Sequence, residues 1–128
     1  MDLVSTAEVW KNPAGTVVEL WQAAMDVGGF SRSFFCFDKV GRLTVFDAVN
    51  FQIPNDDGKP WGMHERWILK SDGVFRAAIP FHFIGLDEKV TPKPKLDQDD
   101  EKFAASWGHT PPPIKTLNEL KLPKALFN

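Results

Sequence analysis

The sequence predicts an α+β fold in which N-terminal helices pack on a four-stranded antiparallel meander, with a proline-rich C-terminal arm. Three observations predict this arrangement. Apolar residues recur at helical spacing over residues 16–27, and they alternate with polar residues in runs between residues 30 and 84. Beyond residue 91, six of the ten prolines lie in a segment with one glycine. We therefore expect a core domain over residues 1–90 and an arm over 91–128.

The N-terminal segment offers two positions at which a helix could begin. Residues 5–8 and 16–19 both have the spacing of a capping box. After the second box, one helical face collects the apolar residues Val17, Leu20, Trp21, Ala24 and Met25. Gly28 and Gly29 then provide a stop. We expect a short first helix and a longer helix over 16–27, with a strand as the alternative because Thr16, Val17 and Val18 also favour β-structure.

The middle of the chain predicts four strands, near residues 30–37, 42–53, 63–70 and 74–83, with a turn at 38–41 and a long loop at 54–62. Residues 71–73 (Ser-Asp-Gly) predict a hairpin. If Gly73 is left-handed, Lys70 faces Val74 and one face collects the pairs Leu69/Phe75, Trp67/Ala77, Glu65/Ile79 and Met63/Phe81. A two-residue turn would divide this apolar set between the two faces, so we expect the three-residue loop.

The arm combines prolines, which favour extended backbone, with too many apolar residues for a solvated linker. We expect it to lie on its own sheet or on another molecule, with a helical turn near 116–121. In architecture alone, a long helix on a curved meander resembles the helix-grip arrangement of cystatin-like and nuclear-transport-factor-like domains. The analogy concerns shape and implies no residue roles.

The composition narrows the classes of function. The 128 residues are 43% hydrophobic and 25% charged, with a net charge of −2 and no basic stripe, so we expect no nucleic-acid partner. One cysteine excludes an intrachain disulfide, and the histidines lack ligand spacing, so no metal and no cofactor are expected. No signal-like or membrane-spanning segment is evident, which favours a soluble, cytoplasmic protein with no membrane partner.

Asp47 and Glu65 interrupt the apolar faces of neighbouring predicted strands, and desolvation of such a pair could support acid–base chemistry. The alternative is that each is simply paired. A four-residue turn at 38–41 sets Arg32 opposite Asp47, a three-residue turn sets Ser33 there, and a bulge would turn Asp47 to solvent. His64 and His82 fall on one face, where they could hold a metal or be hydrogen-bonded only.

Eleven Phe, five Trp and no Tyr favour packing and binding over chemistry. We therefore expect a non-enzymatic interaction protein that binds a protein partner or forms a homo-oligomer. The predicted contact residues are Phe46, Trp61, Ile68, Trp107, Ile114 and Leu117. The alternative is a small-molecule pocket, binding or catalytic, between helix 16–27 and the sheet. Its walls would be Trp21, Phe51, Trp67 and Phe81, with Arg32, Asp47 and Glu65 as polar anchors and catalytic candidates.

Overall fold

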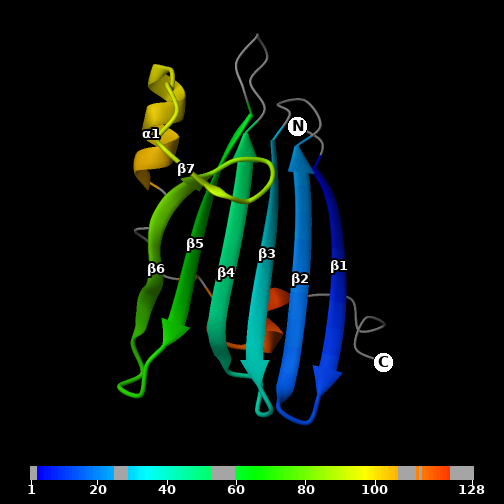
Figure 1. Cartoon of the computed structure of the whole chain (residues 1–128). Coiled ribbons are helices and arrows are strands. Elements are labelled where there is room, and N and C mark those ends of the chain that lie inside the picture. The colour runs from blue at the N-terminus through cyan, green and yellow to red at the C-terminus, as the bar shows by residue number, and fades with distance from the viewer. Residues whose placement is uncertain (1–2, 25–28, 53–59, 107–111, 113, 122–128) are drawn as a thin grey trace.

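The computed structural model describes residues 3–24, 29–52, 60–106, 112 and 114–121 (Figure 1). One antiparallel sheet of seven strands, ordered as in the sequence, dominates it. The strands are β1 (Leu3–Asn12), β2 (Gly15–Ala24), β3 (Gly29–Asp38), β4 (Leu43–Gln52), β5 (Trp61–Leu69), β6 (Phe75–Ile84) and β7 (Val90–Thr91). An α-helix, α1 (Gln98–Ser106), and a 3-10 helix, η1 (Leu117–Leu120), follow. Neither helix has the length and apolar character needed to cross a membrane.

The prediction of N-terminal helices on a four-stranded sheet is wrong, and the helix-grip analogy is wrong with it. Residues 3–12 and 15–24 are strands that pair with each other along their whole length, and β2 also pairs with β3 over ten residues. The apolar residues whose spacing matches a helical face lie on both faces of β2. Val17 and Trp21 lie on one face, Val18 and Leu20 on the other, and β-branched side chains fit a strand paired on both sides.

The four strands of the middle segment are found where the alternation predicts them, as β3 to β6. The three-residue hairpin loop is also confirmed, since the Lys70 amide donates to the Val74 carbonyl at 3.0 Å and Gly73 has φ 81°. Leu69 faces Phe75 and Trp67 faces Ala77, as predicted. The two further predicted pairs are wrong because register shifts between His64 and Trp67 move Ile79 opposite Arg66 and Phe83 opposite Met63.

The back face of the sheet, which carries Val18, Phe35 and Leu43, holds the larger part of the core. Ile114, Leu117 and Leu120 pack against these buried side chains. The Leu43 amide donates to the Lys115 carbonyl at 2.8 Å, and the Leu117 amide donates to the Gly41 carbonyl at 2.9 Å. Figure 1 shows η1 behind β3, at the position where the sequence predicts a helical turn. Residues 114–120 therefore cover the back face of their own sheet.

A second part of the back face, at the start of β5, is covered by α1. Ala104 of this helix and Leu96 before it pack with Trp61 and Met63 of β5. The front face of the sheet has a smaller core at the end near the β6–β7 loop, made by Val49, Phe51 and Ile84 with Phe30 beside them. The rest of the front face is left for the site described below.

Gly15 begins β2 against the backbone of β3. A Cβ atom at Gly15 would lie 1.9 Å from the Phe37 carbonyl oxygen, whereas a Cβ at Gly73 would meet nothing within 4 Å. We expect Gly15→Ala to lower the free energy of unfolding by about 3 kcal/mol or more, because strand pairing must open to admit the methyl group. The control Gly73→Ala should lower it by about 1–2 kcal/mol, which is the cost of a left-handed backbone at a residue with a Cβ atom. Urea titration measures both, and equal losses would contradict this account.

Candidate functional site

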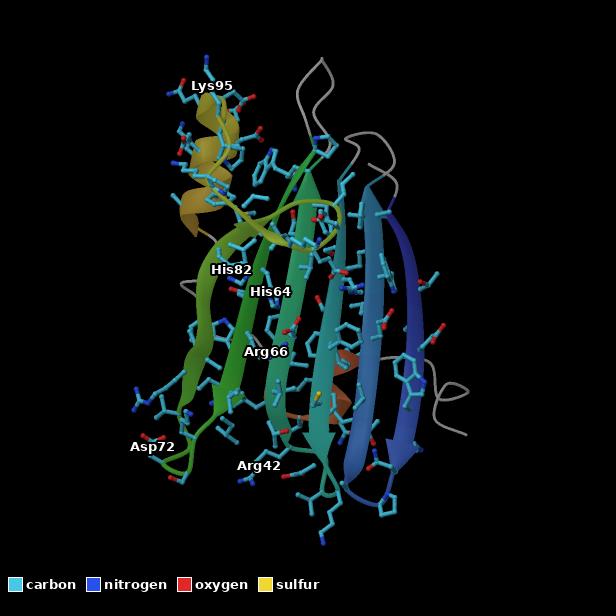
Figure 2. The ribbon with its side chains drawn as sticks, in the orientation of Figure 1. Arg42, His64, Arg66, Asp72, His82 and Lys95 are labelled. Atoms are coloured by element: carbon cyan, nitrogen blue, oxygen red, sulfur yellow. The ribbon has the colours of Figure 1, made fainter. Side chains whose placement is uncertain are left out.

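The front face carries a cavity of about 550 Å³ over β3, β4 and β5. Besides the Cys36 thiol, five side chains of Arg, Asp, His and Glu line it. Arg32 comes from β3, Asp47 from β4, and His64 and Arg66 from β5, while Glu88 reaches in from the β6–β7 loop. Figure 2 shows His64 and Arg66 along β5, with His82 beside His64 on β6.

Asp47 reaches the cavity because of a bulge. The Asp38 amide donates to the Arg42 carbonyl at 2.9 Å, so the loop has three residues, and the register then shifts between Cys36 and Phe37. As a result Phe34 stands opposite Asp47, and both predicted partners, Arg32 and Ser33, are wrong. The bulge does not turn Asp47 to solvent either, because its side chain is only 16% exposed.

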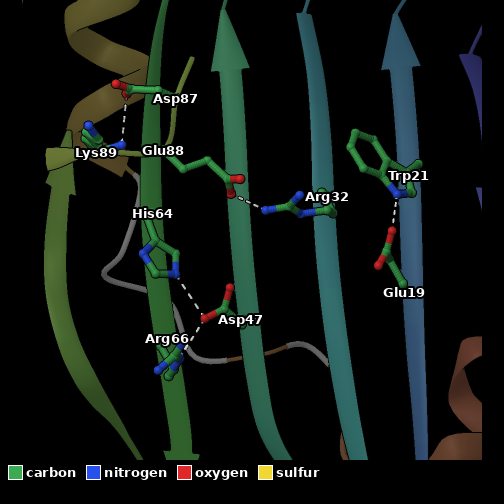
Figure 3. A network of polar contacts seen from close by, with 9 residues as sticks. All are labelled: Glu19, Trp21, Arg32, Asp47, His64, Arg66, Asp87, Glu88 and Lys89. Atoms are coloured by element: carbon green, nitrogen blue, oxygen red, sulfur yellow. Dashed lines mark hydrogen bonds and ion pairs between the residues drawn. The ribbon is translucent and has the colours of Figure 1, made fainter. Parts of the chain in front are cut away.

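Asp47 lies between two basic groups of β5 (Figure 3). Its Oδ2 accepts a hydrogen bond from Arg66 Nε at 2.6 Å and lies 2.9 Å from His64 Nε2. Burial alone would raise the pKa of Asp47, but the hydrogen bonds and positive charges of His64 and Arg66 outweigh burial, so the net pKa lies below its ordinary value. Asp47 is thus an ionised anchor at neutral pH and a weak proton acceptor.

Glu65 lies away from this site. It stands opposite Ala48 on the back face and is 8% exposed, whereas Asp47 stands opposite Arg66 on the front. The prediction that Asp47 and Glu65 share a face is therefore wrong. Its cause is the register of β4 with β5, which pairs Glu65 with Ala48 and so places it on the face opposite to Asp47.

His64 and His82 stand directly opposite each other, with ring centroids 5.1 Å apart in an edge-on arrangement. The predicted pairs Glu65/Ile79 and Met63/Phe81 would place Pro80 opposite His64, and the register shifts in β5–β6 account for the difference. In the described part of the chain, no group of three or more His, Cys, Asp or Glu side chains could hold a metal ion. His109 lies outside that part.

Arg32 is the second charged centre of the cavity. Its guanidinium carbon lies 5.4 Å from the Trp21 ring centre and 5.5 Å from that of Phe34. Arg32 Nη2 donates to Glu88 Oε1 in an ion pair drawn in Figure 3. Its Nε is buried and has no hydrogen-bond partner among the described residues. The two aromatic rings hold the cation in place and leave one donor unused.

Most of the predicted protein-contact residues lie inside the molecule. Phe46 packs on Phe35 with ring centres 5.0 Å apart, Trp61 is 4% exposed, and Ile114 and Leu117 pack on the back face. Ile68 lines the cavity. Trp107 lies outside the described residues. A role in partner binding stays a prediction for this set.

Of the predicted pocket residues, Arg32 and Asp47 line the cavity, and Trp21 contacts Arg32. Phe51 packs at the closed end of the front face, and Trp67 stands opposite Phe46 on the back. The side chain of Phe81 lies outside the described ones. Because residues 15–24 form a strand, the predicted wall from helix 16–27 does not exist.

Sequence reasoning missed Arg66 and Glu88. Arg66 could have been found, since alternation from Glu65 places it on the opposite face. Glu88 has no such signal, because it lies in a turn without glycine at the left-handed position.

No family model matches the chain, and neither curated proteins nor solved structures give a match. Function is therefore inferred from the residues of the cavity.

Because the pKa of Asp47 is lowered, its contribution to the free energy of unfolding should depend on pH. A carboxyl whose pKa is lower in the folded state stabilises the fold above its unfolded pKa, about 4, and this contribution disappears as the pH falls through the folded value. We expect Asp47→Asn to lose about 1–3 kcal/mol of unfolding free energy at pH 7 and progressively less below pH 4. Urea titrations from pH 7 to about 2.5 measure this difference.

The matched control is Asp72→Asn. Asp72 also has a lowered pKa, chiefly from the Val74 amide and Arg76, but its side chain is 52% exposed. Asp72→Asn should therefore lower the free energy of unfolding at pH 7 by less than Asp47→Asn does. A loss for Asp47→Asn that stays constant from pH 7 to 2.5 would contradict the assignment of Asp47 as the ionised anchor.

Proposed function

We propose that the protein binds a small molecule with a largely apolar body and one polar end in the front-face cavity. The observation that carries this proposal is the combination of size and lining. The volume of about 550 Å³ lies within the rough range of 300–1,000 Å³ that small-molecule sites occupy. Beside the charged groups, the lining consists of weakly polar and apolar side chains: Phe34, Cys36, Val45, Val49, Ile68 and Ile84.

The state of the charged groups favours binding over catalysis. Asp47 is held ionised by His64 and Arg66. Burial raises the pKa of the Cys36 thiol, and Asp47 raises it further, while Arg66 opposes them. A thiol with a raised pKa is a poor nucleophile at neutral pH. These two reactive side chains are therefore poised to orient a ligand, not to attack it.

The construction of the cavity wall also supports a preformed site. β3, β4 and β5 pair along most of their length, and the back of the same strands is sealed by residues 114–120 and by α1. At the closed end Phe51 packs against Gly62, where an added Cβ would lie 2.7 Å from the Phe51 ring. A wall fixed from behind loses little freedom on binding, which favours affinity for a small ligand.

Cys36 is the single cysteine of the chain and reports on occupancy. We expect octanol or octanoate to slow the reaction of its thiol with Ellman's reagent about fivefold or more at pH about 8, because a bound molecule covers the cavity lining. The absorbance of the released thiolate measures the rate. If neither compound changes the rate up to its solubility limit, the proposal fails.

The matched control moves the thiol to the surface. In Cys36→Ser/Val40→Cys, the cysteine occupies a turn position where the native side chain is 82% exposed. Its reaction should keep the same rate with and without octanol or octanoate. Equal slowing of both thiols would indicate an effect on the reagent.

Association with a protein partner or a second copy is the other candidate function, and exposed tryptophans favour it. Trp10 is 45% exposed and Trp21 37% exposed, and strand pairing puts both on the front face of β1 and β2. Aromatic side chains of this kind are enriched at protein interfaces. The unpaired outer edge of β1, within the described residues, adds backbone groups that could take up a further strand.

Light scattering after gel filtration measures association between copies. We expect a mass above the 14.4 kDa of one chain for the native protein at high concentration, and a return toward one chain in Trp10→Ser. Val40→Ser, at an exposed turn, should leave the mass unchanged. A native protein of single-chain mass at every concentration would contradict association through this surface.

A further inference from the structure

Three hairpin loops of the sheet have one geometry. In each, the first residue donates its amide to the carbonyl four residues later: Asp38 to Arg42 at 2.9 Å, Lys70 to Val74 at 3.0 Å, and Gly85 to Lys89 at 3.0 Å. In each, the fourth residue donates back to the first at 2.9 Å and has a positive φ. That fourth residue is Gly41, Gly73 and Glu88, with φ of 88°, 81° and 63°.

Glu88 is thus the exception in a position that the same chain elsewhere gives to glycine. A left-handed backbone is unfavourable for any residue with a Cβ atom, and glycine adopts it freely. The turn itself uses only the Glu88 backbone. Its side chain forms the ion pair with Arg32, across the cavity from the loop (Figure 3). A residue held in a costly conformation by the surrounding fold points to a role for its side chain.

The two partners of this ion pair differ in how firmly they are held. Arg32 lies on a central strand, between the rings of Trp21 and Phe34, and its side chain is 24% exposed. Glu88 lies on a loop, and its side chain is 46% exposed. Arg32 also keeps a buried Nε donor without a hydrogen-bond partner among the described residues. Glu88 is therefore the replaceable partner, and Arg32 the fixed one.

We propose that the ligand of the cavity carries a carboxylate, and that this carboxylate replaces Glu88 on Arg32. The proposal rests on the small-molecule function above. A carboxylate has two oxygens that can accept from Nε and a terminal nitrogen of one guanidinium together, so it would use the donor that Glu88 leaves unused. The apolar part of the ligand would lie toward Val45 and Ile68.

The charge balance of the cavity argues for an anion over a cation. Asp47 already has two basic partners, so its negative charge is already neutralised and would attract a cationic ligand only weakly. When Glu88 moves aside into solvent, the lining keeps Arg32 and Arg66 against Asp47 alone, an excess of one positive charge even before His64 is counted. Glu88 thus acts as a resident competitor, which occupies Arg32 until a carboxylate ligand arrives.

Titration calorimetry with octanoate and octanol tests this assignment, because the two probes share a chain and differ in the charged head. We expect the native protein to bind octanoate about tenfold more tightly than octanol at pH about 7.5. Glu88→Gln and Glu88→Gly should tighten octanoate about threefold to tenfold and leave octanol within about twofold. Glu88→Gly also gives the loop the residue found at Gly41 and Gly73, so it keeps the fold while removing the competitor.

Arg32 is tested by its own pair of variants. Arg32→Gln should reduce the ratio of octanoate affinity to octanol affinity to about one. Arg32→Lys keeps the charge but lacks the two parallel donors, so its ratio should lie between those of Arg32→Gln and the native protein. Equal affinities for octanoate and octanol in the native protein, or no response to Glu88→Gln, would overturn the carboxylate assignment and leave the small-molecule function standing. Failure of both probes to bind would overturn the small-molecule function itself.

Discussion

The shift of one residue where β3 pairs with β4 decides which side chains face the cavity. Between Cys36 and Phe37 the register changes, and from there Asp47 shares a face with Arg32 and Phe34. Without this shift, β4 would present Phe46 and Ala48 to the front and turn Asp47, together with Val45 and Val49, to the back. The ion pairs of Asp47 with His64 and Arg66 follow from the β4–β5 register, and the shift places them on the same face as Arg32. A local irregularity in one hairpin thus sets the chemistry of the whole front face.

The two faces of the sheet differ because the helices that the structure describes pack on the back face. The back face receives residues 114–120 and α1, and it contains buried apolar side chains such as Phe37, Leu43 and Met63. Among the residues that the structure describes, the front face is closed at the end where Phe51 and Ile84 pack. The charged side chains of the cavity form ion pairs, Arg32 with Glu88 and Arg66 with Asp47, and His64 is a second partner of Asp47.

The sequence predicts strands well where alternation and turn chemistry agree, as in residues 63–84, whose hairpin has the predicted loop at Gly73. It fails at residues 16–24, because apolar residues on both faces of a strand also match a helical spacing, and because the partner strand at residues 3–12 is far from evident. Bulges have no sequence signal of their own, so the partners of Asp47 and His64 could not be predicted. Arg32 and Asp47 were identifiable as polar residues among apolar ones, whereas their contacts depend on the register.

The packing of Ile114, Leu117 and Leu120 on Phe35 and Leu43 has a consequence for the order of folding. Strands β3 and β4 meet their cover only after some seventy further residues of chain, a loop whose closure is slow. Until then the apolar back of a nearly complete sheet lies open to water and to other chains. We therefore expect a chain synthesised only as far as β6 to be prone to aggregation, and its protection to depend on how soon residues 114–120 follow.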